Sequence, residues 1–128
     1  MEVVKTIEED FVQKIFALDR RVRFVGIIDN EGELIKGGMR RGLIALEPTK
    51  KDEDKLYLKW FLMQTMTDEW SSFLGKKVML YTRYERLDMY GIPLKNSRIL
   101  LVSTEQIDGS SSPFFGEKLL DLVRSTEL

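Results

Sequence analysis

Apolar side chains near the start of the chain recur at the spacing of an α-helix. Those that lie three or four positions apart are Val4, Ile7, Phe11, Ile15 and Leu18, so a helix places them on one face. The pattern predicts a helix over residues 1–20. Arg20 and Arg21 would close its last turn, where cations suit the negative end of the helix dipole.

The next pattern is that of a β-hairpin. Residues 22–29 form a β-branched and apolar run of strand length. Residues 29–32, Asp-Asn-Glu-Gly, have the chemistry of a tight turn, in which Gly32 is free to adopt positive φ. Residues 33–36 are expected to return as a second, short strand.

Both faces of the first strand are apolar. Alternation places Val22, Phe24 and Ile28 on one face and Val25 and Ile27 on the other. A strand that is apolar on both faces is covered on both faces. We therefore expect helices on each side of the sheet.

A long second helix is predicted over residues 52–74, after a connection over residues 37–51 that is rich in glycine and charge. Gly75 follows it in a position that favours a C-terminal cap. The main apolar stripe of this helix is Leu56, Trp60, Met63, Met66, Trp70 and Leu74. Tyr57, Leu58 and Phe61 point elsewhere, so the helix has more than one apolar surface to cover.

Three strands and a helix complete the pattern. The strand-like runs are residues 77–85, 87–94 and 98–103, separated by short turns. A polar loop over residues 104–112 precedes Ser112-Pro113, which has the chemistry of a helix start. The apolar side of the closing helix is formed by Phe115, Leu119, Leu122 and Val123.

Composition narrows the class of protein. The chain has 128 residues, 43% hydrophobic and 32% charged, which fits one globular domain over residues 1–128. Because it contains neither Cys nor His, disulfides, thiolate metal sites and the commonest general base are excluded. A net charge of −1 disfavours nucleic acid as a partner.

The chain shows no targeting signal. Its first ten residues carry several acids, and the longest apolar runs are far too short for a membrane span. We therefore expect a cytoplasmic protein without a membrane-spanning segment.

Candidate chemistry is sparse, and each candidate has a structural alternative. Residues 37–42, Gly-Gly-Met-Arg-Arg-Gly, resemble an anion-binding loop but lack the Gly-Lys-Ser/Thr ending of a phosphate loop. The carboxylates of Asp29, Glu31 and Glu33 are of the type that binds hard cations such as magnesium, although a turn explains their presence. Hydroxyl side chains have no histidine to activate them. We predict no catalytic residue, no metal ligand, no cofactor and no enzyme activity.

The order helix, strand, strand, helix, strand, strand, strand, helix resembles the roadblock (dynein light chain) domains, relatives of longin and profilin-like folds. The residues that carry the resemblance are the hairpin over residues 24–35 and the late strand over residues 98–104. The sequence is also similar to small archaeal members of this type. The resemblance implies an α+β fold, with a five-stranded antiparallel sheet, its first and last helices on one face and its middle helix on the other.

The resemblance also implies a function. Roadblock domains commonly form homodimers through the middle helix and the edge strand after it, and in prokaryotes many accompany small Ras-like GTPases as scaffolds or regulators. It implies no catalytic residue. On this basis we expect a non-enzymatic scaffold or adaptor whose dimer interface contains Tyr57, Leu58, Phe61, Val78, Leu80, Tyr81 and Tyr84.

An alternative remains open at this point. Similar hairpins occur in PAS-like small-molecule sensors, which would have a ligand pocket between the middle helix and the sheet. An adaptor predicts a filled core and an exposed apolar surface at that place.

Overall fold

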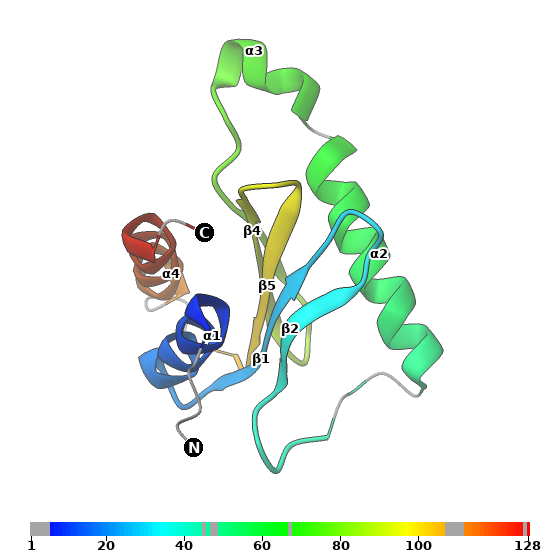
Figure 1. Ribbon diagram of the computed structural model, residues 1–128, viewed down its shortest axis with the longest axis vertical. Coiled ribbons are helices and arrows are strands. Elements are labelled where there is room, and N and C mark those ends of the chain that lie inside the picture. The colour runs from blue at the N-terminus through cyan, green and yellow to red at the C-terminus, as the bar shows by residue number, and fades with distance from the viewer. Residues whose placement is uncertain (1–5, 45, 47–48, 67, 107–111, 127) are drawn as a thin grey trace.

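A five-stranded antiparallel sheet forms the centre of the computed structural model, in the order β2-β1-β5-β4-β3 (Figure 1). The structure describes residues 6–44, 46, 49–66, 68–106, 112–126 and 128. The strands are β1 (Val22–Ile28), β2 (Leu34–Met39), β3 (Leu80–Arg83), β4 (Asp88–Leu94) and β5 (Arg98–Thr104). The sheet order leaves β2 and β3 at its two edges.

Helices cover both faces of this sheet. They are α1 (Ile7–Leu18), α2 (Lys50–Met66), the short η1 (Asp68–Trp70) and α3 (Ser71–Leu74), and α4 (Ser112–Thr126). Figure 1 shows α1 and α4 on one side of the sheet and α2 on the other. This arrangement confirms the predicted fold class and the predicted distribution of helices.

The first helix is shorter than predicted. Thr6 caps its N-terminus, because the Thr6 hydroxyl accepts from the Glu9 N–H at 3.1 Å and the Glu9 carboxylate accepts from the Thr6 N–H. The helix ends at Leu18, so Arg20 and Arg21 lie beyond it rather than in its last turn. Its buried side chains are Phe11, Val12 and Ile15, whereas Ile7 is 64% exposed. Val4 lies outside the described residues.

Two apolar clusters lie on opposite faces of the sheet. Under α1 and α4, the cluster includes Phe11, Ile15, Val25, Ile27 and Leu119. Under α2, it includes Phe24, Ile28, Tyr57, Trp60 and Leu101. Val22 packs in the first cluster, not with Phe24 as predicted. The register of β1 against β5 shifts between Val22 and Phe24, which reverses the alternation of side chains at that point.

The hairpin contains a longer second strand than predicted. β2 continues to Met39 because Gly37 and Gly38 pair with Gly26 and Val25. The first half of the predicted loop over residues 37–42 is therefore strand. In the turn, Gly32 has a φ of 81°, and a Cβ atom at this position would lie 2.8 Å from Leu58 Cα. Only glycine allows both this backbone conformation and so close an approach of α2.

The predicted second helix is interrupted. α2 ends at Met66, and the chain continues through η1 and α3 to Gly75, which has a φ of 87°. We call residues 68–79 the arm. Figure 1 shows α3 extending beyond the end of the sheet. The arm therefore has no sheet face to cover it.

The remaining strands are close to the prediction except β3. β4 and β5 agree to within one residue at either end, whereas β3 covers only Leu80–Arg83 and not residues 77–85. α4 begins at Ser112, and it buries Phe115, Leu119 and Leu120. Most of the predicted polar loop before it lies outside the described residues.

Candidate functional site

The inner side of α2 is packed tightly on the sheet. Trp60 is fully buried against Gly91, where an added Cβ atom would lie 3.1 Å from the Trp60 ring. The Tyr57 ring stacks on Phe24 with 5.6 Å between centroids. Gln64 is 4% exposed and completes this side. The sheet-facing side of α2 thus contains Tyr57, Trp60 and Gln64.

The predicted apolar stripe is therefore only partly correct. Trp60 is buried and Leu56 packs at the edge of the cluster. Met63, Met66, Trp70 and Leu74 are instead 36%, 72%, 49% and 72% exposed. Met63 and Met66 lie outside the side of α2 that is formed by Tyr57, Trp60 and Gln64. Trp70 and Leu74 come after the end of α2 and extend past the sheet.

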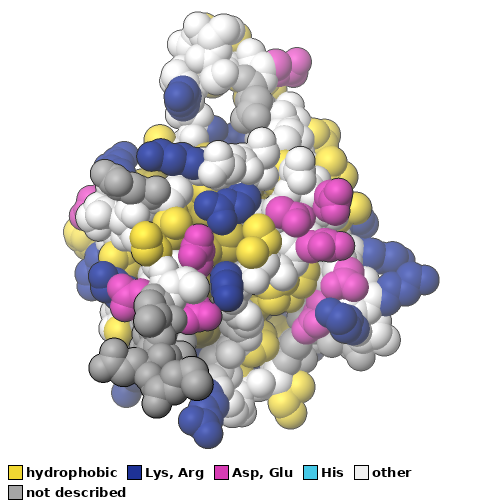
Figure 2. All heavy atoms as spheres, in the orientation of Figure 1, with side chains coloured by type: hydrophobic (Ala, Val, Ile, Leu, Met, Phe, Trp, Pro, Cys, Tyr) yellow, Lys and Arg dark blue, Asp and Glu magenta, His cyan; other side chains and the backbone are white. Residues whose placement is uncertain are grey.

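These exposed apolar side chains form a continuous series along α2 and the arm. We call the set Leu62, Met63, Met66, Trp70, Phe73, Leu74 and Val78 the apolar flank. Its members are 36% to 73% exposed. Figure 2 shows hydrophobic side chains at the surface on the α2 side of the molecule. Large exposed apolar patches on soluble domains usually mark interaction sites.

β3 follows the apolar flank in the sequence and forms one edge of the sheet. Among the described residues, no strand lies on its outer side. β3 pairs only with β4, from Leu80 opposite Gly91 to Arg83 opposite Asp88. Tyr81 is 39% exposed, with its ring 5.0 Å from that of Tyr90. An open edge of this kind can accept a strand from another chain.

The residues predicted for the dimer interface separate into three groups. Tyr57 lies in the core, and Phe61 and Leu80 are half-buried against the cluster under α2. Leu58 is 40% exposed but lies against Gly32 of the β1–β2 turn. Val78, Tyr81 and Tyr84 are 51%, 39% and 45% exposed on and around β3.

Leu58 is thus not part of the β3 side of the molecule. β2 and β3 occupy opposite edges of the sheet, and the β1–β2 turn is at the β2 edge. The sequence pattern also placed Met66 and Leu74 in the main apolar stripe of one long helix, whereas both side chains are exposed. The available signal was the run Thr-Asp-Glu at positions 67–69 and Ser-Ser at 71–72, since these short polar residues favour caps and turns over helix interiors.

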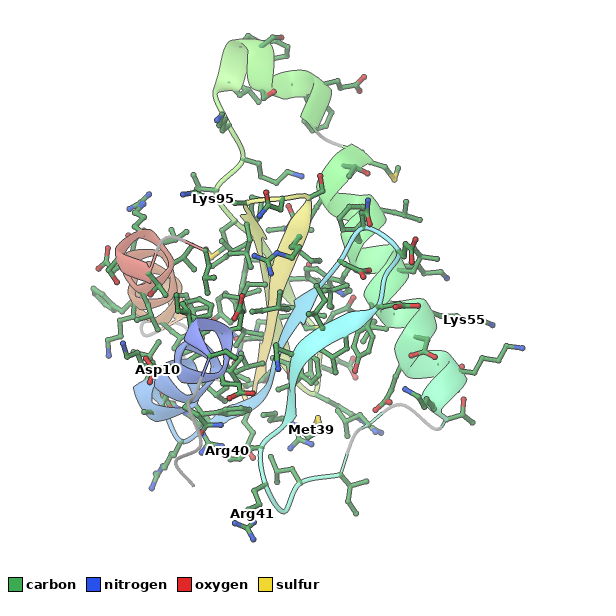
Figure 3. All side chains as sticks on the ribbon, in the orientation of Figure 1. Asp10, Met39, Arg40, Arg41, Lys55 and Lys95 are labelled. Atoms are coloured by element: carbon green, nitrogen blue, oxygen red, sulfur yellow. The ribbon has the colours of Figure 1, made fainter. Side chains whose placement is uncertain are left out.

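Arg40, from the predicted loop over residues 37–42, is bound within the fold. The Arg40 guanidinium donates to the carbonyl oxygens of Val22, Phe16 and Asp19 at 2.7, 2.8 and 3.0 Å. It also lies over the Phe16 ring, 5.1 Å from its centroid. Figure 3 shows Arg40 beside α1 and Arg41 further out on the loop. Three of its donors therefore hold Arg40 against the end of α1 and the start of β1.

Arg21 and Arg23 are also paired. The Arg21 guanidinium donates to both carboxylate oxygens of Asp19, at 3.0 and 2.9 Å. This hydrogen bonding lowers the pKa of Asp19 to about 2. Arg23 lies 3.8 Å from the Glu105 carboxylate. Arg21 and Arg23 are thus each paired with a carboxylate.

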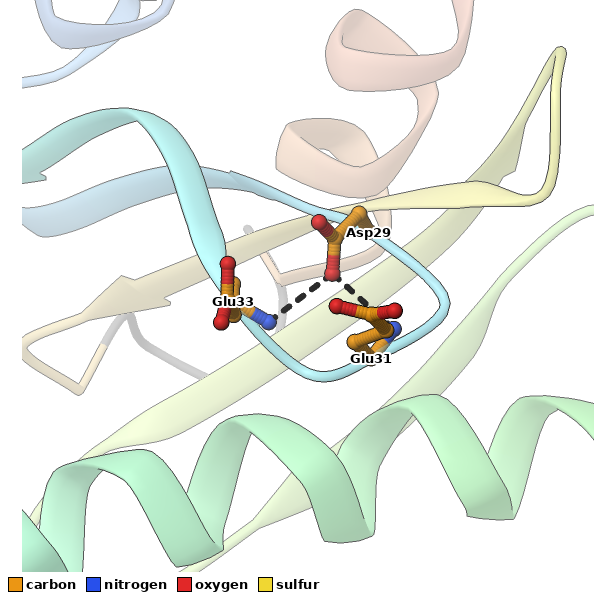
Figure 4. A group of neighbouring side chains, drawn as sticks. All are labelled: Asp29, Glu31 and Glu33. Carbon is orange, nitrogen blue, oxygen red and sulfur yellow. Dashed lines mark hydrogen bonds between the residues drawn. The ribbon is translucent and has the colours of Figure 1, made fainter.

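The acidic turn is organised by its own backbone. Asp29 Oδ1 accepts from the N–H groups of Glu31 and Glu33 at 2.9 and 3.0 Å (Figure 4). The carboxylate oxygens of the three residues lie within 4.8 Å of one another, and Glu31 and Glu33 are exposed. The turn accounts for the position of Asp29, so nothing beyond proximity indicates a metal.

The space between α2 and the sheet is small. A cavity of about 30 Å³ lies there, lined by Phe24, Leu56, Tyr57, Met89 and Leu101 among others. Small-molecule sites typically measure about 300–1,000 Å³. This cavity is therefore too small to be the ligand pocket that a PAS-like sensor would have there. Among the described helices, none combines the length and hydropathy needed to cross a membrane.

Comparison with known proteins was made by sequence and by structure. No protein-family model matches the sequence, and no curated protein matches it. Solved structures do match over nearly the whole chain. The gliding protein MglB of Thermus thermophilus has a TM-score of 0.69 at 12% identity, covering 98% of this chain and 93% of that one.

Two other structures agree. A structure of MglB with a tetrameric arrangement has a TM-score of 0.68 at 13% identity, covering 98% and 93% of the two chains. A Roadblock/LC7 domain from Streptomyces avermitilis has a TM-score of 0.61 at 9% identity, covering 90% and 92%. At these identities the likeness concerns the fold. The chain therefore has the fold of the Roadblock/LC7 domains and of MglB.

Proposed function

We propose that this chain is a non-enzymatic homodimeric adaptor of the cytoplasm that acts with a small Ras-like GTPase. The observation that carries the dimer is the apolar flank, which continues from α2 through the arm towards the open edge of β3. A protomer alone leaves this surface in water. A second copy that covers it would remove several large side chains from water, at about 25 cal/mol per Å² of apolar area.

The β3 edge gives the second copy a way to align. Two β3 strands related by a two-fold axis would pair antiparallel and extend the sheet, because a two-fold interface uses the same patch on both copies. Tyr81 and Val78 would then lie close to the axis, with the arms on either side. Tyr57 contributes no surface in this arrangement, and Leu58 lies outside it.

The oligomeric state tests the proposed dimer. Met66→Glu changes a residue that is 72% exposed, so the protomer should still fold while a charge is buried at the interface. We expect a dimer for the wild type and a monomer for this variant by light scattering at matched concentrations. Phe61→Glu is a poorer test, since Phe61 is half-buried and its substitution would also disturb the core.

A matched control is available on the opposite side of the sheet. Glu117 is exposed on α4, and Glu117→Lys should leave the dimer unchanged. A monomeric wild type, or a Met66→Glu protein that remains dimeric, would place the interface elsewhere.

The GTPase partner rests on the roadblock resemblance and on the fold. MglB and Roadblock/LC7 domains share the architecture, but a fold alone does not establish a function. We expect purified Ras-like GTPases from the source organism to bind the dimer, with an affinity that depends on the bound nucleotide. Titration calorimetry with the GDP and GTP-analogue forms measures this. Absence of binding to either form of every such GTPase would remove this part of the proposal.

A further inference from the structure

A groove of about 620 Å³ lies on the α4 side of the arm and is separate from the apolar flank except at Val78. We call it the basic groove. α4 supplies Leu120, Val123 and Arg124, and the segment after α3 supplies Lys76, Lys77 and Val78. The end of β4 and the turn after it supply residues 92–95, and Ser71 and Leu128 complete the lining.

The charged side chains in this groove have one sign. Its lining contains Lys76, Lys77, Lys95 and Arg124 and, among the described residues, no Asp or Glu. They come from three separate segments of the chain. Figure 3 marks Lys95 near the end of the sheet that the arm overhangs, and Figure 2 shows Lys and Arg side chains gathered below the arm beside hydrophobic surface.

Three of these cations lack an acidic partner within the described part of the chain. Elsewhere Lys and Arg side chains commonly pair with carboxylates, as for Lys14, Arg21, Arg23, Lys36, Lys50, Arg83 and Arg98. Lys76, Lys95 and Arg124 form no such ion pair with any described residue, and all three are exposed. Lys77 differs, since its ammonium donates to the Gln64 carbonyl. Unpaired cations around an apolar floor complement a ligand that is both acidic and apolar.

The shape of the groove favours a helix over an added strand. β4 continues to Leu94, beyond its last pairing with β3 at Gly91, so one edge of residues 92–94 is open. Pro93 lies in this stretch and has no N–H to donate, which weakens strand addition there. Recognition must then use side chains. An amphipathic helix would place an apolar stripe on Pro93, Leu94 and Val123 and acidic residues beside the surrounding cations.

We propose that the basic groove binds an acidic amphipathic helix of a partner protein. A single fatty-acid headgroup fits the arrangement less well, because it needs its cations at one end of an apolar tube, whereas here they lie on three segments around an open groove. The groove shares Val78 with the proposed dimer interface, but Lys95, Arg124 and the rest of its α4 lining lie outside that interface, so the proposal does not rest on the proposed function.

The test uses the full-length protein and a fluorescein-labelled synthetic helical peptide with Leu at three- and four-residue spacing and Glu at the flanking positions. We expect saturable binding by fluorescence polarisation that weakens as salt is raised. Lys95→Glu combined with Arg124→Glu should weaken binding at least about 10-fold, as expected when two charge contacts of this kind are reversed. Lys76→Glu, on another segment, should weaken it to a smaller extent.

Controls separate this site from general attraction between opposite charges. Lys118→Glu changes an exposed lysine on α4 that does not line the groove, and it should bind as the wild type does. Peptides with Lys in place of Glu, or Ser in place of Leu, should not bind. Backbone amide signals of Ile92, Leu94 and Val123 should shift on addition of the Leu/Glu peptide.

The opposite results would overturn the proposal. These are equal binding by the Lys95→Glu/Arg124→Glu protein and the wild type, equal binding of the Ser-substituted peptide, or binding of palmitate with none of the peptide. Circular dichroism and light scattering show whether each variant keeps its fold and its oligomeric state. A loss of binding together with an unchanged assembly distinguishes the groove from the dimer interface.

Discussion

The two faces of the sheet are covered to different extents. On one face, α1 and α4 together bury Phe11, Ile15 and Leu119 completely. On the other, α2 buries Trp60 completely, but Leu62, Met63 and Met66 on the same helix remain exposed. Two helices therefore close one face within a protomer, whereas a single helix and its arm leave apolar surface for another chain. The difference separates side chains that stabilise the fold from those available for association.

The largest expected effect contrasts one leucine from each region. Leu119→Ala removes a fully buried side chain from the α1 and α4 face and should lower the free energy of unfolding by about 4 kcal/mol. Leu62→Ala, at 46% exposure, should change it by less than about 0.5 kcal/mol in a monomeric background. Each substitution is made in the Met66→Glu protein, which we expect to be monomeric, and urea unfolding measures the free energy of unfolding of both variants. Similar losses of unfolding free energy in the two proteins would mean that Leu62 of α2 is as well packed as Leu119 of α4.

A second prediction concerns how α2 is held against the hairpin. Gly32→Ala forces positive φ on a residue with a Cβ atom, which would lie 2.8 Å from Leu58 Cα. Either the turn or the helix must move, and we expect a loss of about 3 kcal/mol in the free energy of unfolding. Glu31→Ala, in the same turn but exposed, is the control. An unchanged thermal midpoint for Gly32→Ala would show that α2 is not fixed by this contact.

A third prediction addresses the end of α1. Arg40→Ala removes the donors to three carbonyl oxygens and should cost about 2 kcal/mol of unfolding free energy. The neighbouring Arg41 is exposed, and Arg41→Ala should be neutral in the same chemical denaturation. If inorganic phosphate stabilised the wild type but not Arg40→Ala, the anion-binding interpretation of this loop would be restored.

The smallest effect is a pH dependence on the same side of the molecule. The pKa of Asp19 is lowered to about 2 by its hydrogen bonds to Arg21, so Asp19 contributes stability above its unfolded pKa near 4. This contribution is lost as pH falls from about 4 to about 2. Arg21→Gln should remove it, so the stability difference between the two proteins should shrink over that interval. A difference that stays constant down to pH 2 would contradict the role of this pair.

Much of the fold follows from local patterns in the sequence. The apolar spacing around Phe11 and Ile15, the turn at Gly32 and the apolar run in residues 98–103 each predict their element without reference to the rest of the chain. Strands joined by short turns usually pair, which gives the antiparallel β3-β4-β5 part of the sheet. The absence of His and Cys excludes whole classes of metal and catalytic site on composition alone.

Tertiary structure decided what these patterns leave open. Whether Trp70 and Leu74 are buried depends on where α2 and the sheet end, and helical periodicity contains no information about that. The side to which Val22 points depends on a register shift in its pairing with β5. Arg40 lies more than 15 residues from each carbonyl oxygen that it binds, so no local pattern distinguishes it from Arg41.

One physical reason explains why the sequence predicts some of these features and not others. Secondary structure is determined largely by interactions between residues a few positions apart, which a sequence displays directly. Exposure, register and long-range hydrogen bonds depend on which distant surfaces meet and how far each extends. The sequence by itself therefore determined the order of the elements and the apolar character of α2, and only the folded chain decided which side chains of α2 remain free for a partner.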